Sequence, residues 1–366
     1  MRAGYERVQP GVAGASFLAS REALERACLV LRTAHRVLWT VGDVDAGDGD
    51  RLYRGVAALA RWSELVPPDK TFAVHATARD NPAFRDARFA GLRTKDAIVD
   101  HVRDELGLRP SVDVADPDVQ VRIAISGRRG VLSLDLAGRD SLHARGYRTQ
   151  AGAAPLRESL AAGLLAIAEH RPDEPLLDPC CGSGTILIEA ALAARAIAPG
   201  LAGHRGYGFE RWPGFEPERL AKSIAGLERA IRPPLPTRLV GTDLDGQVLT
   251  MARENAERAG VSDDIRLLRN DAGSWSPPLE LSRAGPGLIA TNPPWGERLG
   301  DRQAADRLLE RMAQRWREVL PGWRAAVLVG DRQQASLLRL ADPRLVPLRH
   351  GALDVTLVLG RVPGPS

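Results

Sequence analysis

Residues 175–198 read PLLDPCCGSGTILIEAALAARAIA. A short apolar run ends at Asp178, two glycines follow at Gly182 and Gly184, and a long apolar stretch begins at Thr185. Glycines permit a tight turn between a buried strand and a helix. We interpret the stretch as strand, turn and helix, which is the repeating element of a doubly wound parallel sheet.

The same alternation continues toward the C-terminus. TRLVGTDLDGQVLTMARENAERAG (237–260) predicts a second strand, an acidic turn and a helix. We therefore expect residues 155–366 to form an α/β domain with a Rossmann-like, mostly parallel sheet. Residues from about 199 to 237 interrupt the first crossover and predict an insertion with one helix of its own. Further apolar runs predict strands within 287–296, 324–331 and 355–362.

The first part of the chain has a different texture. Ser20 is a suitable N-cap for a helix, and RVLWTV (36–41) is typical of a strand, so residues 1–47 predict a small α+β unit. Residues 48–145 predict a second α+β unit. Its expected elements are a strand at 71–78, a helix at 91–106 and a hairpin at 119–138.

Composition narrows the class of protein only slightly. The chain has 366 residues, a net charge of +4 and three cysteines, two of them adjacent at Cys180 and Cys181. An odd cysteine count argues against a disulfide framework and favours a reducing cytoplasm. We find no apolar run long enough for a membrane span and no apolar segment typical of a signal peptide. Nearly all basic residues are arginine, which fits either a nucleic-acid partner or a GC-rich genome.

Ligands of doubly wound sheets bind at the carboxyl ends of the strands, and the first informative end is the turn after Asp178. A dinucleotide site would have the pattern G-x-G-x-x-G, whereas this turn begins with an acid. A carboxylate suits a cationic ligand end, such as an amino-acid ammonium, better than a pyrophosphate. The alternative is a tight strand–helix turn without a ligand.

Two further strand ends carry acids. Asp243 lies between a predicted strand and a helix, where its carboxylate can accept bonds from both hydroxyls of a ribose. Asp245 is expected to cap the following helix. Asp271 follows a short apolar run and can accept a bond from an adenine amino group, although an Asp that only forms a turn is an equal alternative.

The fourth strand end is IATNPPWG (289–296). The side-chain oxygen of Asn292 and the carbonyl of Pro293 can each accept one N–H bond from an exocyclic amino group of a base. Pro293 and Pro294 stiffen these acceptors, and Trp295 offers a flat face for stacking. The alternative is a strand-ending turn with a core tryptophan. A cysteine nucleophile at Cys180 or Cys181 is disfavoured, because both lie in the turn expected to bind the cofactor.

These motifs resemble the class I S-adenosylmethionine-dependent methyltransferases of the N-P-P-aromatic type. DPCCGSGT is similar to that family's D-P-x-C-G-S-G-T, and TNPPWGERLG to its N-P-P-Y-G-x-R-L, with Trp295 in place of the usual tyrosine. Stacking survives that change, whereas a phenol hydrogen bond would not. The resemblance implies S-adenosylmethionine as cofactor, no metal, and catalysis by residues 292–295. It implies cofactor contacts from Asp178, Cys181, Gly182, Gly184, Thr185, Asp243, Asp271 and Asn292, and weaker ones from Leu156 and Glu158.

Residues 48–145 resemble a THUMP domain, preceded by a ferredoxin-like unit. The similarity rests on TFAVHATARDNPAFRDARFAGLRTKDAIVDHV (71–102) and DSLHARGYRTQAGAAPLRESLAA (140–162). The resemblance implies binding to structured RNA, and two basic groups near aromatic residues suit phosphate contacts with some stacking. A solvated charged face is the alternative for both. The candidate RNA contacts are Arg85, Arg88, Arg93 and Lys95 in one group, and Arg139, His143, Arg145 and Arg148 with Tyr147 in the other.

Over nearly its whole length the sequence is most similar to the bacterial large-subunit rRNA guanine-N2 methyltransferases. Longer members carry a second methyltransferase, so the resemblance implies only the guanine-N2 activity for this chain. A tRNA guanine-N2 methyltransferase of the same three-part build is the alternative. A non-catalytic RNA-binding factor that keeps the fold is a second alternative, which the acids and Asn292 disfavour. The oligomeric state stays open.

Overall fold

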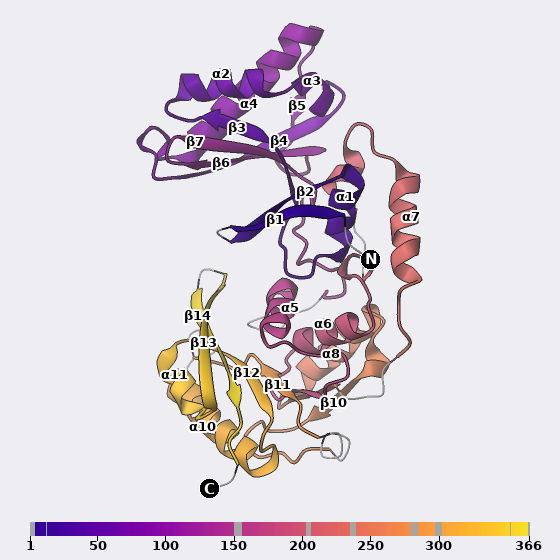
Figure 1. The fold of residues 1–366 in the computed structure, drawn as a ribbon, viewed down its shortest axis with the longest axis vertical. Helices are drawn as coiled ribbons and strands as arrows, with labels where there is room; N and C mark the ends of the chain where they lie inside the picture. The colour runs from indigo at the N-terminus through magenta and orange to yellow at the C-terminus, as the bar shows by residue number, and fades with distance from the viewer. Residues whose placement is uncertain are drawn as a thin grey trace. The chain divides into compact units, whose positions relative to one another are not determined.

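The computed structural model describes residues 4–11, 13–149, 156–202, 206–234, 239–278, 281, 285–296, 302–351 and 353–364. The chain divides into two compact units, described separately below (Figure 1). Unit 1 comprises residues 1–142 and 205–225, and unit 2 comprises residues 143–204 and 226–366. None of the helices in the described ranges is long and apolar enough to cross a membrane.

Unit 1 begins with an antiparallel hairpin of β1 (Tyr5–Gly11) and β2 (Gly14–Ala19), followed by α1 (Arg21–Val30). The Ser20 hydroxyl accepts a bond from the Ala23 N–H, which confirms the predicted N-cap. The hairpin was not predicted, because it is short and most of its side chains are exposed, so it carries little apolar pattern.

The larger part of unit 1 is a five-stranded sheet in the order β3-β7-β6-β4-β5. The predicted strand at 71–78, helix at 91–106 and hairpin at 119–138 are confirmed. The helix α4 packs against α2 and against β4. The strands are β3 (Leu38–Asp45), β4 (Thr71–Arg79), β5 (Ser111–Val112), β6 (Val119–Ser126) and β7 (Arg129–Asp135). The helices are α2 (Gly49–Leu59), α3 (Trp62–Leu65) and α4 (Ala87–Leu106), with a 3-10 turn η1 (Pro82–Phe84).

The boundary expected near residue 47 cuts across this sheet. β3 pairs with β7 from Leu38 to Asp45, so a strand assigned to the N-terminal unit hydrogen-bonds within the second. The division of the chain at residues 47 and 145 stays a prediction.

The expected insertion at 199–237 contains its predicted helix, α7 (Pro217–Glu228), but residues 206–225 group with unit 1. Tyr207 donates to the Cys28 carbonyl at 3.3 Å, and a Cβ added at Gly208 would lie 2.7 Å from the Gly138 Cα. The segment is thus packed closely on the sheet and on α1. Residues 203–205 and 235–238 of the expected insertion lie outside the described ranges. Short 3-10 turns are η2 (Pro199–Leu201) and η3 (Gly208–Arg211).

Unit 2 contains a seven-stranded sheet in the order β10-β9-β8-β11-β12-β14-β13. The first five strands in that order are parallel to one another, and β14 is antiparallel to both of its neighbours. The predicted Rossmann-like α/β domain is therefore confirmed. The strands are β8 (Leu176–Asp178), β9 (Leu239–Asp243), β10 (Ile265–Arg269), β11 (Leu288–Thr291), β12 (Arg324–Val329), β13 (Ala341–His350) and β14 (Leu353–Arg361).

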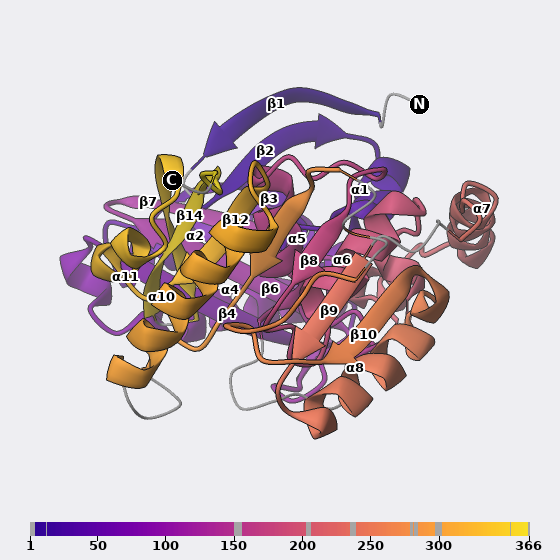
Figure 2. The ribbon, with the colours of Figure 1, turned by 90° about the horizontal axis from the view of Figure 1, so that it is seen from below.

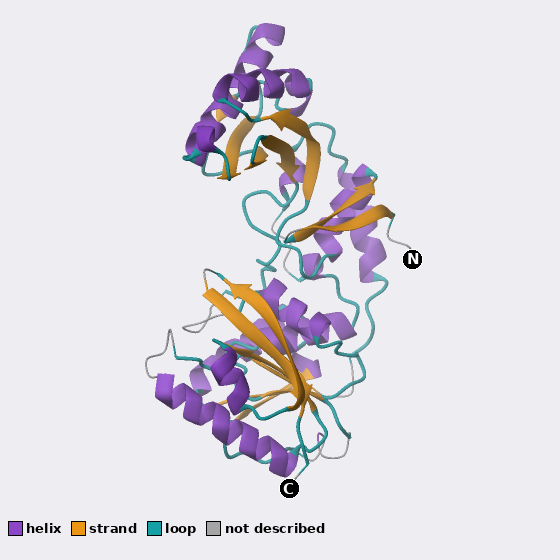
Figure 3. Cartoon of the chain, turned by 60° about the vertical axis from the view of Figure 1, so that its left-hand side comes forward, coloured by secondary structure: helices purple, strands orange, loops and turns teal. Residues whose placement is uncertain are grey.

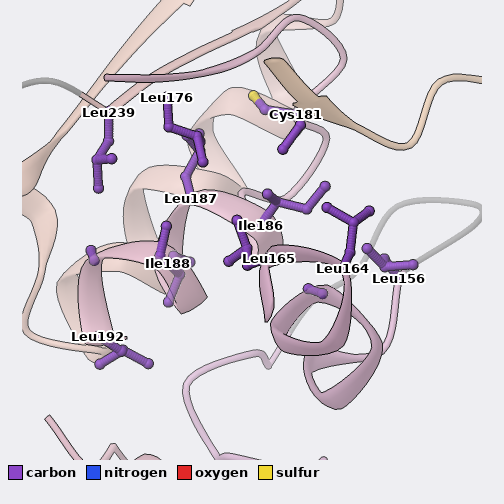
Figure 4. Packing of buried hydrophobic residues seen from close by; sticks show 14 of the residues in the cluster. Leu156, Leu164, Leu165, Leu176, Cys181, Ile186, Leu187, Ile188, Leu192 and Leu239 are labelled. Carbon is purple, nitrogen blue, oxygen red and sulfur yellow. The ribbon is translucent and has the colours of Figure 1, made fainter. Parts of the chain in front are cut away.

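Helices cover both faces of this sheet (Figures 2 and 3). Adjacent strand residues point to opposite faces, so Leu176 packs in the cluster under α5, α6 and α8, whereas Leu177 packs in the cluster under α10 and α11. Figure 4 shows part of the first cluster, with Leu164, Leu187 and Cys181. The helices are α5 (Glu158–Ile167), α6 (Thr185–Ala194), α8 (Gly246–Arg258), α10 (Arg302–Val319) and α11 (Arg332–Leu337), with a 3-10 turn η4 (Ser262–Asp264).

Candidate active site at the carboxyl edge of the sheet

The strand order reverses between β8 and β11, which are adjacent and parallel. From β8 the chain continues to β9 and then β10 on one side of the sheet, whereas from β11 it continues to β12 on the other side. Such a switch point opens a crevice at the carboxyl ends of the strands. The turn after Asp178 and the segment after Thr291 therefore emerge side by side, and Asp243 and Asp271 follow on the next strands.

The turn from β8 to α6 takes a conformation that suits glycine. Gly182 has φ +52° and Gly184 has φ +83°, a region that other residues rarely adopt. The Gly182 N–H donates to Asp243 Oδ2 at 3.0 Å, and the Ser183 carbonyl accepts from Asn255 Nδ2 at 3.0 Å. These two hydrogen bonds fix the backbone of the turn. The space beside Gly182 is empty, because a Cβ added there would meet no atom within 4 Å.

Asp178 is a buried carboxylate in this turn, with 1% of its surface exposed. Burial, together with the nearby charge of Asp243, raises its pKa to about 7, although the hydrogen bond from the Cys180 N–H acts to lower it. Among the described residues no basic side chain forms an ion pair with Asp178. A buried acid without a cation favours a positively charged ligand group.

Asp243 joins two strand ends. Its Oδ2 accepts from Gly182, and its Oδ1 accepts from the Asp245 N–H at 3.0 Å. Asp245 in turn accepts from the Gln247 N–H at the start of α8, which confirms its predicted role as a helix cap. Each carboxylate oxygen of Asp243 keeps a further lone pair with which to accept a ribose hydroxyl.

Asp271 already has two partners in this structure. Its Oδ1 accepts from the Gly273 N–H at 2.8 Å and from Arg311 Nη2 at 2.9 Å. The turn-forming role, which was the alternative, is therefore present. The contact with an adenine amino group stays a prediction.

Asn292 follows β11 directly and is partly exposed. Its side-chain Oδ1 accepts from the Trp295 indole N–H at 3.0 Å. Trp295 is 6% exposed, and its ring lies edge-on to His350 with the ring centroids 6.1 Å apart. The ring is thus a core residue in this structure, as the alternative interpretation expected. Stacking of a base on Trp295 stays a prediction.

A buried glutamine of α11 hydrogen-bonds to the backbone of the segment that contains Asn292 and Trp295. Gln334 in α11 is fully buried, and its Nε2 donates to the Trp295 carbonyl at 3.1 Å and to Asp306 Oδ1 at 2.8 Å. Its Oε1 accepts from the Gly330 N–H at 2.9 Å. Sequence reasoning missed Gln334 and Asn255. The available signal was an amide side chain at an apolar-face position of a helix, which is weak without the tertiary partners.

Leu156 and Glu158 lie at the start of α5, and both side chains face the protein interior. Leu156 packs in the core cluster near Leu164 (Figure 4). The Glu158 carboxylate accepts from Arg148 Nη2 at 3.0 Å, and burial raises its pKa. Their proposed contact with the cofactor stays a prediction.

Cys181 is buried and Cys180 is partly buried in the turn, and desolvation raises the pKa of each thiol well above its ordinary value. Thiolates are the nucleophilic form, so the environment disfavours cysteine catalysis, as expected. Thr185 is the first residue of α6 and is also buried. Among the described residues no cluster of His, Cys, Asp or Glu could hold a metal ion.

The first group of candidate RNA contacts lies in unit 1, around the start of α4. Arg85 is exposed, and Arg88 is 89% exposed and pairs with Asp86. The Arg93 side chain is 27% exposed, pairs with Asp50 at 2.9 Å and lies over the Tyr53 ring. Lys95 is 31% exposed and pairs with the neighbouring Asp96. The exposed members of this group remain available to a polyanion.

The second group requires a correction. The Arg145 side chain is only 2% exposed and pairs with Glu189 of α6 at 3.4 Å. Tyr147 is 1% exposed and donates to the same carboxylate at 3.2 Å. These two residues bind the chain to α6 and do not present a surface to RNA. Their local sequence is polar and basic, so the burial could not be inferred from it.

The remaining members of the second group are intermediate. Arg148 is 13% exposed and is held by Glu158 and by the Leu156 carbonyl. His143 is 28% exposed, with its Nδ1 3.7 Å from Glu158. Arg139 belongs to unit 1 and is exposed. RNA contacts by these three residues stay predictions.

Comparison with known proteins agrees with this architecture. Residues 145–358 match the family of the RMKL-like methyltransferase domain, residues 47–135 match the THUMP domain, and residues 1–38 match the RlmL ferredoxin-like domain. The ribosomal RNA large subunit methyltransferase K/L of Pseudomonas entomophila (strain L48) is 38% identical over 360 residues, which cover 94% of this chain and 47% of that protein. The chain thus spans about half the length of the curated relatives it matches.

Two solved structures share the arrangement across nearly the whole chain. A possible methylase from Clostridium difficile 630 superimposes with a TM-score of 0.87 at 27% identity, covering 99% of this chain and 93% of that one. The crystal structure of SMU.472 complexed with SAH gives a TM-score of 0.85 at 28% identity, with coverage of 98% and 92%.

Proposed function

This chain belongs to the RMKL-like methyltransferase family and carries a THUMP domain, and from that membership we propose that it methylates the N2 amino group of a guanine in 23S ribosomal RNA. The observation that carries the proposal is the carboxyl edge of the unit 2 sheet. There, a buried acid, which has no basic partner within the described part of the chain, and an asparagine oxygen follow neighbouring strands at the switch point.

The residues present fit S-adenosylmethionine, which supplies a methyl group on a positively charged sulfur. The Asp178 carboxylate would pair with the cofactor's ammonium, because a buried acid gains most from a cation. Asp243 would accept the ribose hydroxyls, and Gly182 would let the backbone approach closely. The related structure of SMU.472 holds SAH, the product left after the methyl group departs.

The Asn292 amide would bind the substrate amino group. Its Oδ1 has two lone pairs, one of which accepts from Trp295, so the second can accept one N–H of the guanine N2 group. The Pro293 carbonyl would accept the other N–H. These two bonds would turn the nitrogen lone pair out of the base plane and toward the methyl donor. The sulfur is already charged, so the geometry asks for no strong general base.

Unit 1 would bind the RNA through Arg85, Arg88 and Arg93 on and before α4, by contacts with phosphates. A ribosomal RNA substrate would place the protein in the cytoplasm. The two alternative functions are a tRNA guanine-N2 methyltransferase and a non-catalytic RNA-binding factor.

A transfer assay separates the three. The purified chain would be incubated with labelled S-adenosylmethionine and, in separate reactions, 23S rRNA, assembled large subunits and total tRNA. Nucleosides from each RNA would then be analysed by mass spectrometry. We expect N2-methylguanosine in 23S rRNA. Label confined to tRNA would support the tRNA enzyme, and a lack of label in every RNA would contradict methyltransferase activity on RNA.

A further inference from the structure

Unit 1 contains a cavity of about 170 Å³ that none of the predicted site residues lines. Its walls come from three separated parts of the chain: α1, the sheet formed by β3 and the end of β7, and the segment around η3. All of these parts belong to unit 1. The cavity is smaller than the roughly 300 Å³ typical of pockets for drug-sized ligands, so it suits a single ring system.

The walls are largely aromatic. Trp39 of β3 and Trp212 lie with their ring centroids 6.2 Å apart and their planes at 34°, and Phe209 is fully buried beside them. Trp39 is 39% exposed although it is a large aromatic residue. Flat π-faces at a protein surface are the surfaces on which unpaired bases stack.

Trp212 adds a second aromatic wall. It is 7% exposed, and its indole nitrogen is shielded from solvent, so the carbon atoms of the ring line the cavity. An occupant of this cavity therefore meets ring carbons from Trp39, Trp212 and Phe209. A nucleobase offers the flat π-face that suits such walls.

The charge at this cavity suits a nucleotide. Glu25 is the acidic residue in the lining, and it is 2% exposed and accepts from both Arg21 and Arg219 at 2.8–3.1 Å. The Arg21 side chain lines the cavity and is 39% exposed, with its Nε bonded to Glu25 and its Nη2 to the Pro213 carbonyl. A neutralised acid and a partly exposed arginine favour a phosphate next to the base.

We propose that this cavity binds one unpaired base of the RNA substrate, stacked against Trp39 beside the ring of Trp212. The proposal rests on the RNA substrate proposed above and adds a base-binding site remote in sequence from residues 292–295. It predicts a preference for RNA with unpaired nucleotides over fully paired RNA, because only a splayed base can enter the cavity.

The test compares variants of the full chain in binding to a labelled rRNA stem-loop and to a fully paired duplex of equal length, by fluorescence anisotropy at one salt concentration. Trp39→Ala should weaken stem-loop binding about tenfold, the loss of one stacked base, and leave duplex binding unchanged. Leu38→Ala is the matched control, since Leu38 is 43% exposed and neighbours Trp39 on the opposite face of β3. It should change neither affinity.

Trp212→Leu replaces the second aromatic wall with an aliphatic side chain, so it should weaken stem-loop binding by roughly threefold. Stem-loops with 4-thiouridine in the unpaired positions should crosslink under ultraviolet light to peptides containing Trp39 or Trp212, and this readout on the unmutated chain does not depend on variant folding. Equal stem-loop affinity in all variants, with crosslinks elsewhere, would overturn the site and leave the cavity to another occupant, such as an aromatic side chain of a protein.

Methyl transfer measured on the same unmutated protein separates the two proposals. The first case is that the chain methylates rRNA, but Trp39→Ala leaves stem-loop affinity unchanged and no crosslink falls on Trp39 or Trp212. The base-binding site is then wrong and the proposed function stands. If Trp39-dependent binding and crosslinks occur without methyl transfer to any RNA, the base-binding site stands and the proposed methyltransferase activity is wrong.

Discussion

The arginines near the start of α4 and the arginine at position 145 have the same chemistry in opposite surroundings. Arg88 is 89% exposed and shares a solvated pair with Asp86, whereas the Arg145 side chain is 2% exposed and faces Glu189 and Tyr147 inside unit 2. Water screens the first pair and is excluded from the second. Burial therefore decides whether an arginine in this chain can meet a phosphate or holds the fold together.

The largest test of this comparison removes the buried cation. Arg145→Met should lower the free energy of unfolding by about 3–5 kcal/mol, because Glu189 is left as a buried charge without Arg145. Urea denaturation measures it, and Arg88→Met is the control that should unfold at the unmutated midpoint. The double variant Arg145→Met with Glu189→Leu should recover much of the loss. Equal urea midpoints for the two single variants would contradict the claim that Arg145, unlike Arg88, stabilises the fold.

Asp178 sharpens the comparison because it is a buried charge without a basic partner among the described residues. With a pKa near 7, the carboxyl is mostly protonated at pH 6, so a bound ammonium must first displace a proton. S-adenosylmethionine affinity should rise roughly tenfold from pH 6 to pH 8, and Asp178→Asn should bind more weakly with a flat profile. Calorimetry in two buffers would show the released proton. A flat profile in the unmutated protein contradicts the assignment.

The same group fixes the sign of a stability effect. Because its pKa is raised above the ordinary value of 3.8, the cofactor-free protein should lose stability as the pH rises from about 4 to 7. Added S-adenosylmethionine should oppose that loss at the upper end of the range.

The exposed side of the comparison concerns RNA. Arg88→Glu should weaken rRNA binding by roughly fivefold at low salt and make the salt dependence shallower, because one phosphate contact is lost. Arg103→Glu lies at the other end of the same helix and serves as the control, with a side chain that is 51% exposed. Identical salt slopes for both variants and the unmutated protein would remove the α4 surface from RNA binding.

The smallest expected effect concerns a buried neutral bond. Trp295→Phe replaces the indole with a smaller phenyl ring and removes the N–H that orients Asn292, so kcat should fall roughly threefold while the KM for RNA stays the same. Trp316→Phe is the control, since that indole is also buried but makes no hydrogen bond among the described residues. A rise in the KM for RNA with kcat unchanged would favour base stacking over orientation of the amide.

Local patterns were enough to predict most of the fold. The sheet of unit 2 follows from apolar runs that end in Asp178, Asp243 and Thr291, because both the strand period and the glycine turn are encoded in neighbouring residues. The edge strand β13 was missed, since its largely exposed side chains leave no apolar run. The grouping of residues 206–225 with unit 1 was also missed, because it depends on contacts such as Tyr207 to Cys28.

The candidate site was predictable to a similar depth. Motif positions such as Asp178, Gly184 and Asn292 could be found from spacing alone. The residues that hold them, Asn255 and Gln334, could not, since their partners are 72 and 39 residues away in the sequence. Arg145 was assigned to the RNA surface for the same reason, since its partner Glu189 is 44 residues away in the sequence.

The central claim is that Asn292 Oδ1 accepts a hydrogen bond from the guanine N2 amino group at the switch point of the unit 2 sheet. It is tested most directly by measuring single-turnover methyl transfer to 23S rRNA and S-adenosylmethionine affinity in the same preparation of Asn292→Ala. The account predicts that transfer falls at least a hundredfold, as for loss of a preorganised polar contact to the reacting group, while cofactor affinity changes little. Transfer within tenfold of the unmutated rate would contradict it.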